Sequence, residues 1–400
     1  MSIVAVPSSP SRARTGDDRR RTLRDALALG GPFVLALGLS LSLAGRPSYW
    51  QDEAFTLSAT RRPISSLPHL LRDVDAVHGL YYLVSSPWTH ISTAPAWVRL
   101  PSALATAVAA ALVTVLGWQL VDRRTGVTTG LVFGVLPITS YYGAEARGYA
   151  LATACSVAAA VVLVSAARTG RPRVWVAYGV LVAVSGYAFL FTVLFVVAHL
   201  AWLAAVRPRP GTALRFGIAV AAAAVVLAPL VAVGSRQASF QIPWIETPDQ
   251  SALERVWTTW SSGSIALAVV VWSLTAVAVV SARGRAGRRN RPAVVLGLGM
   301  ALAPVVVLVA ASFIHPVYAP RYVQSSVSGF ALLCGVTLAR IRRVPSLAVV
   351  LVAVSVLGLP LRSASARPTA TATPSRRSPT SSRRNGSPAT PLSTAPRTGA

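Results

Sequence analysis

The chain has 400 residues, of which 53% are hydrophobic and 12% are charged, and its mean hydropathy is +0.56. Soluble domains carry about 25% charged residues, so this composition excludes an ordinary soluble protein and, for most of the chain, intrinsic disorder. A disulfide scaffold is also excluded, because the two cysteines, Cys155 and Cys334, both lie in apolar runs. The composition therefore indicates an all-α polytopic membrane protein.

The net charge of +26 comes from arginine, since the chain contains no lysine, and most of it lies in the breaks between apolar runs. Breaks rich in arginine alternate with breaks that hold few, as the positive-inside rule requires. We therefore assign the arginines to the cytoplasmic face, against anionic lipids, and expect no nucleic-acid partner. The arginine-rich breaks are 123–124, 168–173, 207–215, 283–291 and 340–343.

The apolar segments predict about eleven transmembrane helices, each of which needs about 20 mostly apolar residues. Residues 1–25 are polar and rich in arginine, and we expect a disordered cytoplasmic N-terminus before an uncleaved first span. The transmembrane domain is predicted over 26–361, where the run 174–206 fits either a re-entrant hairpin or two short helices. The predicted spans are 26–45, 98–120, 126–142, 149–167, 174–191, 192–206, 214–234, 264–282, 293–314, 323–339 and 345–361.

The first predicted external loop is residues 46–97, and shorter external segments follow at 143–148, 235–263 and 315–322. In the first loop apolar residues recur at helical spacing over 64–77, which predicts an amphipathic helix lying on the membrane surface. Residues 362–400 consist mainly of small, polar and Arg residues and are predicted to be a disordered tail. We hypothesise that truncation or a frame shift produced this tail, because aliphatic residues cease abruptly.

Eight of the twelve acidic residues fall on the predicted external side. Asp52 and Glu53 stand out, because the aromatic neighbours Trp50 and Phe55 would desolvate them. Desolvated carboxylates make usable general bases near neutral pH, so one of the pair could act while the other orients it or binds metal. Ordinary solvation of a loop is the alternative for any single acid.

Two further external patches carry candidate chemistry. On a helix, Asp75 and His78 would share a face, and with Asp52 they could hold a divalent cation, although the spacing matches no metal motif. Glu145 and Arg147 could form a buried ion pair between two helices. Alternatively, Arg147 could bind a phosphate, which suits a guanidinium, and Arg321, which is also flanked by aromatic residues, is a second candidate for that role.

Four segments in this order resemble the glycosyltransferase family 39 group of membrane-embedded C-type glycosyltransferases, which are related to protein O-mannosyltransferases. Residues 50–56 resemble the family's Asp-Glu motif, and residues 75–82 its Asp…His-Pro-Pro-Leu-Tyr-Tyr segment, with Gly79 in place of the first proline and one residue fewer. Residues 142–149 are similar to Tyr-Ala-Gln-Glu-Ala-Arg-Met-Tyr, and residues 320–322 to Pro-Arg-Tyr. The likeness spans residues 26–340.

The resemblance implies the C-type glycosyltransferase fold and transfer of mannose or another hexose from a polyprenyl-phosphate donor to an external glycan, lipid or protein hydroxyl. Asp52 would be the base of an inverting displacement, supported by Glu53. Asp75 and His78 would bind the acceptor or a metal ion, and Arg147 and Arg321 would bind the donor phosphate. The remaining residues of the implied pocket are Tyr82, Glu145, Tyr149 and Tyr322.

A lipid-linked sugar transporter or flippase is the alternative function. Transport sites use intramembrane charges near the midplane, whereas the predicted spans hold essentially no acids and His199 is their main polar exception. A non-catalytic scaffold would leave the pair Asp52 and Glu53 without a role. The use of arginine without lysine, together with many Ala and Val residues, suggests a bacterium with GC-rich DNA and a location in its plasma membrane.

Overall fold

The computed structural model describes residues 16–45, 48–206, 208–250, 254 and 256–341. These residues form α-helices and short 3-10 helices, with no β-strand among them, so the predicted all-α class is confirmed. The predicted last span 345–361, the tail 362–400 and residues 1–15 of the predicted N-terminal segment lie outside the described residues.

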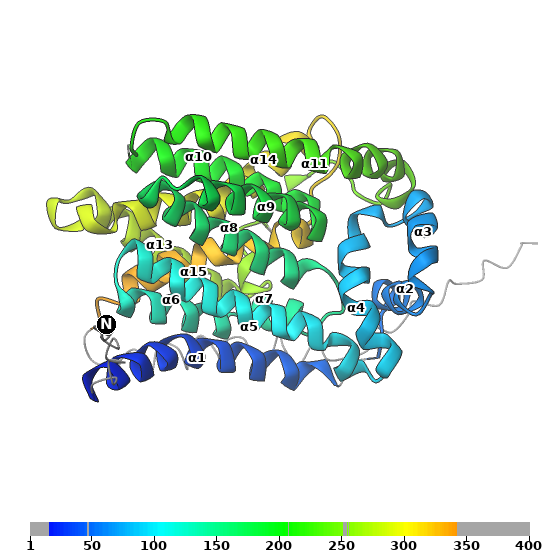
Figure 1. Cartoon of the computed structure of the whole chain (residues 1–400), viewed down its shortest axis with the longest axis horizontal. Helices are drawn as coiled ribbons and strands as arrows, with labels where there is room; N and C mark the ends of the chain where they lie inside the picture. The colour runs from blue at the N-terminus through cyan, green and yellow to red at the C-terminus, as the bar shows by residue number, and fades with distance from the viewer. Residues whose placement is uncertain (1–15, 46–47, 207, 251–253, 255, 342–400) are drawn as a thin grey trace, which may run out of the picture. The chain divides into compact units, whose positions relative to one another are not determined.

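Within the described residues, six helical segments are long and apolar enough to cross a membrane. The chain is therefore a multi-pass membrane protein, and Figure 1 shows α1, α5 and α11 lying roughly parallel. The helices that contain these segments are α1 (Gly16–Ala44), α5 (Pro95–Leu120), α8 (Tyr149–Thr169), α11 (Thr212–Gln241), α13 (Ile265–Arg283) and α14 (Arg291–Ser312), the last preceded by the 3-10 helix η5 (Arg285–Asn290).

One predicted span is broken, and one predicted division between spans is present, where the backbone leaves the helical region. The span predicted over 126–142 becomes α6 (Arg123–Val135) and α7 (Pro137–Gly143). Leu136 has ψ 129°, as expected for a residue that precedes a proline. The run 174–206 forms α9 (Pro172–Ala188), the 3-10 helix η3 (Leu190–Leu194) and α10 (Phe195–Val206), with Phe189 extended at the break. Of the two alternatives, the structure has two short helices.

The segment predicted as the first external loop folds into short helices at one end of the bundle. In Figure 1 the helices α2 (Gln51–Thr60), α3 (Leu67–Asp73) and α4 (Gly79–Ile91) gather there. The predicted amphipathic helix over 64–77 is wrong as a single element: η1 (Ile64–Ser66), α3 and η2 (Ala76–His78) replace it. Val74 is extended and Asp75 is left-handed at φ 57°, which interrupts the helix. The buried Leu67 packs with Tyr81 and Tyr82 rather than facing lipid.

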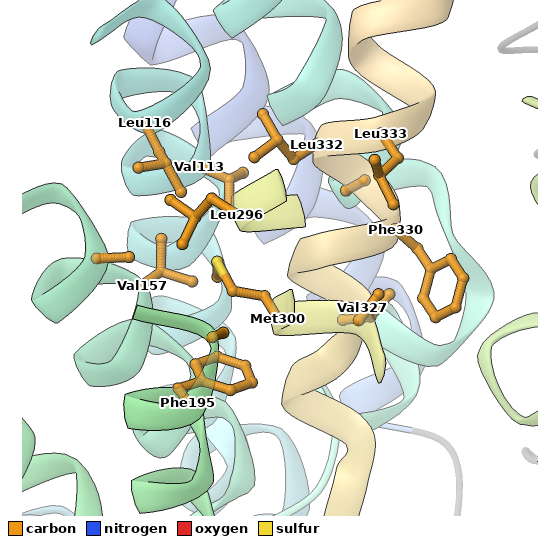
Figure 2. Close-up of a cluster of buried hydrophobic side chains, with 14 of the residues drawn as sticks. Val113, Leu116, Val157, Phe195, Leu296, Met300, Val327, Phe330, Leu332 and Leu333 are labelled. Atoms are coloured by element: carbon orange, nitrogen blue, oxygen red, sulfur yellow. The ribbon is translucent and has the colours of Figure 1, made fainter. Parts of the chain in front are cut away.

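The core lies between the long helices, where side chains from α5, α8, α10 and α14 meet those of α15 (Val327–Leu338), which follows the 3-10 helix η6 (Pro320–Ser326). In lipid, helices associate by close packing more than by the hydrophobic effect. Buried glycines allow that approach, since a Cβ on Gly329 would lie 2.5 Å from the carbonyl oxygen of Gly297. Figure 2 shows this cluster, including Val113, Leu116, Val157, Phe195, Leu296, Met300, Val327, Phe330, Leu332 and Leu333.

We expect Gly329→Ala to destabilise the bundle, because the new methyl would meet the backbone of Gly297 and Ala301, which cannot rotate away. Overpacking of this kind costs about 1–3 kcal/mol. The control is Gly38→Ala in α1, where a Cβ meets nothing within 4 Å. Thermal unfolding of the purified protein in detergent should show a lower melting temperature for Gly329→Ala only. Equal melting temperatures for the two variants would contradict the packing at this position.

Candidate active site

Helix α2 separates its two neighbouring acids. Asp52 and Glu53 occupy its first turn, where carboxylates interact favourably with the helix dipole. Successive helix residues point about 100° apart, because a turn contains 3.6 residues. The Asp52 side chain is 26% exposed and lines a cavity, whereas that of Glu53 is 1% exposed and lies outside the lining. The expected desolvation therefore falls on Glu53, while Asp52 is partly accessible.

Glu53 forms a buried ion pair with Arg99 of α5. Arg99 donates from Nε to Glu53 Oε1 at 2.7 Å and from Nη2 to Oε2 at 2.5 Å. Another guanidinium nitrogen donates to the carbonyl of Ala44 at 2.8 Å, and the backbone N–H of Ala146 donates to Glu53 Oε1 at 2.9 Å. One carboxylate thus connects α2 to α5, to the end of α1 through Arg99, and to the loop between α7 and α8. This geometry gives Glu53 a supporting place behind Asp52.

Arg147, in the loop between α7 and α8, is the centre of the polar cluster. Its Nη2 lies 3.5 Å from Asp52 Oδ2 and 2.9 Å from His78 Nε2, and its Nη1 lies 3.4 Å from the Tyr82 hydroxyl. Its ion pair is therefore with Asp52, and the alternative of a pair with Glu145 is not what the structure contains. The Arg147 residue is 6% exposed but still lines the cavity.

The segment before α4 contributes Asp75 and His78. The left-handed Asp75 accepts a hydrogen bond from the Tyr82 hydroxyl at 2.8 Å, which leaves Tyr82 just behind the cavity wall. Burial, followed by the positive charges of Arg147 and Arg321, lowers the pKa of His78 well below its usual value. His78 is therefore neutral at pH 7 and can accept a hydrogen bond from Arg147.

Arg321, in η6, completes the cluster from a distant part of the chain. Its Nη1 lies 3.3 Å from Asp52 Oδ2, so two guanidinium groups face one carboxylate. The Arg321 guanidinium carbon lies 4.8 Å from the ring centroid of Trp244 and 5.9 Å from that of Trp50, distances at which cation–π attraction acts. The aromatic rings flank this partly exposed arginine, which lines the cavity.

Glu145 is buried beside the cluster and lies outside the cavity lining. Its Oε2 has no hydrogen-bond partner among the residues that the structure describes. Burial, followed by the charge of Glu53, raises the pKa of Glu145 to about 8, although Arg147 acts in the opposite direction. Glu145 is therefore largely protonated at pH 7.

The cavity itself has a volume of about 810 Å³ and two kinds of wall. One wall is polar and charged, and it carries Asp52 between Arg147 and Arg321. The other wall is apolar and comes from the break before η3 and from the last turns of α11. Its residues include Phe189, Leu190, Phe191, Val231, Gly234 and Ala238, while Asp75, His78, Tyr149 and Tyr322 complete the polar side.

Three parts of this site were not anticipated from the sequence. The aromatic support of Arg321 by Trp244 and the α11 wall depend on the fold, and no local pattern indicates them. Arg99 did leave a signal, because it is a single charged residue at the start of the apolar run 98–120. Charged residues in such runs usually have a buried partner.

The proposed metal ligands do not fit a metal site. Among the described residues, no group of three or more His, Cys, Asp and Glu side chains is placed to hold a metal ion. His78 directs Nε2 at Arg147, and Asp52 faces two guanidinium groups that would repel a dication. We therefore derive no step through a metal ion.

Comparisons with known proteins agree with the arrangement of the helices. Residues 80–234 match the family described as Dolichyl-phosphate-mannose-protein mannosyltransferase. A comparison with curated proteins finds no match. ArnT from Cupriavidus metallidurans bound to undecaprenyl phosphate is similar with a TM-score of 0.57 and 15% identity, over 83% of this chain and 63% of that chain. The apo oligosaccharyltransferase of Archaeoglobus fulgidus is similar with a TM-score of 0.55 and 11% identity, over 84% of this chain and 55% of that chain.

The chain has the C-type glycosyltransferase fold. The predicted resemblance is thereby confirmed at the level of the fold, and the chain spans less than two thirds of the length of these two structures. The matched part, 80–234, includes Tyr82, Glu145 and Arg147, whereas Asp52 and Arg321 lie on either side of it.

We expect Glu53→Gln to destabilise this C-type fold strongly, because it leaves the buried Arg99 charge without its partner. Breaking a buried ion pair costs about 3–5 kcal/mol. Arg99→Met should be similarly harmful, and the double variant should recover part of the loss. Unfolding in detergent would measure all three. Asp25→Asn is the control, since its pair with Arg123 is exposed and such pairs contribute about 0–1 kcal/mol. Strictly additive single losses would contradict coupling between Glu53 and Arg99.

The raised pKa of Glu145 predicts a loss of stability as the pH rises from about 4.5 to 8. In that window the folded protein keeps a proton that the unfolded chain releases, so the free energy of unfolding falls by up to about 1.4 kcal/mol per pH unit. Glu145→Gln should remove this dependence, whereas Glu254→Gln, at an exposed position, should retain it. Melting temperatures measured from pH 5 to pH 9 would test this. The same dependence of melting temperature on pH in the wild type and in Glu145→Gln would contradict it.

Proposed function

We propose that the chain is a membrane glycosyltransferase that moves mannose or another hexose from a polyprenyl-phosphate donor to an acceptor hydroxyl. The observation that carries the proposal is a cavity in which Asp52 contacts both Arg147 and Arg321 and whose lining also includes apolar residues such as Phe191 and Val231. A polyprenyl-phosphate sugar has matching parts: an anionic phosphate, a polar sugar and an apolar chain. The similarity to ArnT bound to undecaprenyl phosphate supports this class of donor.

In this proposal the donor phosphate binds to Arg147 and Arg321. Guanidinium groups suit phosphate, because their N–H groups form a planar fork. Both arginines also contact Asp52, so an entering phosphate would compete with that carboxylate and leave it free to face the acceptor. The lipid chain would run along the apolar wall near Phe191 and Val231.

Asp52 is proposed to act as the general base. It removes the proton of the acceptor hydroxyl as the oxygen attacks the anomeric carbon. The bond from that carbon to the phosphate oxygen breaks on the opposite side, so the anomeric configuration inverts and polyprenyl phosphate leaves. Charge develops on the leaving phosphate, where preorganised cations lower the barrier most. Glu53 supports the first turn of α2 through Arg99.

Asp75 and His78 are proposed to bind the acceptor, which can be a glycan, a lipid or a protein hydroxyl. Both line the cavity beside Arg147, and Tyr82 holds the Asp75 carboxylate. A carboxylate and a neutral imidazole together offer hydrogen-bond acceptors and a donor, as a polyhydroxylated acceptor requires. Tyr149 and Tyr322 would border the sugar.

The location proposed is a bacterial plasma membrane, with a cytoplasmic N-terminus and an external site. Arg123, Arg168 and Arg215 lie where α6 starts, α8 ends and α11 starts. The site lies where α7 ends and α8 starts, which is the opposite end of those helices. Since arginine favours the cytoplasmic face, the cavity opens on the extracytoplasmic side.

We expect Asp52→Asn to lower the rate of sugar transfer by about 10²- to 10⁴-fold, which is the usual contribution of a general base. The variant should stay folded and inserted, because an amide occupies the same volume. The measurement is transfer of radiolabelled sugar from a polyprenyl-phosphate donor to an acceptor fraction prepared from bacterial envelopes. Asp73→Asn, a matched change at an exposed acid in the same segment, is the control. Undiminished transfer by Asp52→Asn would remove Asp52 from the mechanism.

A further inference from the structure

Helix α11 reaches beyond the predicted span end at 234 and runs to Gln241. Gly234, Ser235, Ala238 and Gln241 of this extension line the cavity. Gln237 lies among them in sequence, but its side chain is outside the lining and only 2% of the residue is exposed. A polar side chain so deeply buried needs hydrogen-bond partners, and those partners indicate what it does.

The Gln237 amide joins the two ends of the interrupted segment between α3 and η2. Its Nε2 donates to the carbonyl oxygens of Leu71 at 3.0 Å and Arg72 at 3.2 Å. Its Oε1 accepts from the backbone N–H of Ala76 at 2.9 Å. Carbonyls at the end of a helix and N–H groups at the start of the next have no partner within their own helices. One side chain therefore satisfies backbone groups on both sides of Val74 and Asp75.

This bridge determines where Asp75 and His78 lie. Asp75 is one of two non-glycine residues with positive φ among the described residues, a conformation that persists when its surroundings hold it. From the same helix Gln241 reaches Asp75 Oδ1 at 3.4 Å, and Gly234 leaves room for Val77. Helix α11 thus lines part of the cavity and, through Gln237, holds the segment that packs against it.

We infer that Gln237 is a positioning residue for the acceptor side of the site. It fixes the 74–78 segment so that Asp75 and His78 point into the cavity that holds Asp52. The inference rests on the proposed function for its catalytic consequence. The placement of the segment by Gln237 is a property of the fold and can be measured without any substrate.

The first test is hydrogen exchange on the full-length protein in lipid nanodiscs. Gln237→Met keeps the length of the side chain and removes all three hydrogen bonds. Exchange over 74–78 should accelerate by about tenfold or more, since three hydrogen bonds that hold the segment are lost. The matched control is Gln119→Met, which removes a part-buried hydrogen bond to Ser165 at the other end of the bundle. It should leave exchange over 74–78 unchanged.

The second test separates positioning from general stability through kinetics. With a radiolabelled undecaprenyl-phosphate sugar as donor and an envelope fraction as acceptor, Gln237→Met should lower kcat/KM for the acceptor by about 10- to 100-fold. Misplacement of a binding group by about 1 Å has an effect of this size. The KM for the donor should change less than this, because within the described part of the chain Gln237 forms no hydrogen bond to Arg147 or Arg321 and reaches Arg147 only through His78. Gln119→Met should change neither parameter.

Each outcome decides the inference. Unchanged exchange over 74–78 in Gln237→Met, or equal changes in Gln119→Met, would overturn it. If Gln237→Met impaired the kinetic parameters for donor and acceptor equally, Gln237 would have only a structural role, and the inference of acceptor-side positioning would be wrong. Faster exchange in Gln237→Met, combined with no transfer by the wild type, would overturn the proposed function and leave the placement of the segment intact. If Gln237→Met does not fold, Gln237→Glu tests the same bridge, because its carboxylate would repel the carbonyls of Leu71 and Arg72 and should also accelerate exchange.

Discussion

The buried ion pair between Glu53 and Arg99 is the contact on which the candidate site depends. Two opposite charges that are almost fully removed from water stay stable only when further hydrogen bonds satisfy them. Here the carbonyl of Ala44 and the N–H of Ala146 complete the set. Because these partners come from α1, α5 and the loop after α7, the pair fixes the start of α2 against the bundle. Asp52, the preceding residue, is thereby held at the cavity wall.

The site also illustrates how environment gives similar carboxyl groups different roles. Asp52, Glu53 and Glu145 lie within one small region, yet each has a different surrounding. Glu53 is enclosed with a single guanidinium, Asp52 shares two guanidiniums at a partly open surface, and Glu145 is buried with an unpartnered oxygen. Burial favours the protonated form of Glu145, whereas Asp52 forms ion pairs with Arg147 and Arg321. Of these three, only Asp52 lines the cavity, so it is the one placed to meet a substrate.

Comparison of sequence and structure shows which signals are local. The apolar runs predicted most helices correctly, because their length and hydropathy are properties of neighbouring residues. Pro137 interrupts the span predicted over 126–142. The proline was visible in the sequence, but the span was predicted from the apolar residues around it. The left-handed Asp75 gave no sequence signal, since its conformation depends on Tyr82 and on Gln237 from α11. The helical spacing over 64–77 therefore predicted one continuous helix wrongly, because tertiary hydrogen bonds hold the interrupted segment.

The sequence by itself determined the class of the protein, the approximate helices, the orientation expected from arginine, and the short motifs that contain the candidate residues. These follow from composition and from residues close together in the chain. Only the tertiary structure decided that Asp52 meets Arg147 and Arg321, that Glu53 turns to Arg99, and that the end of α11 lines the same cavity. Those contacts join residues up to 269 positions apart. No local sequence pattern predicts contacts between residues so far apart in the chain, because these contacts result from how the helices pack.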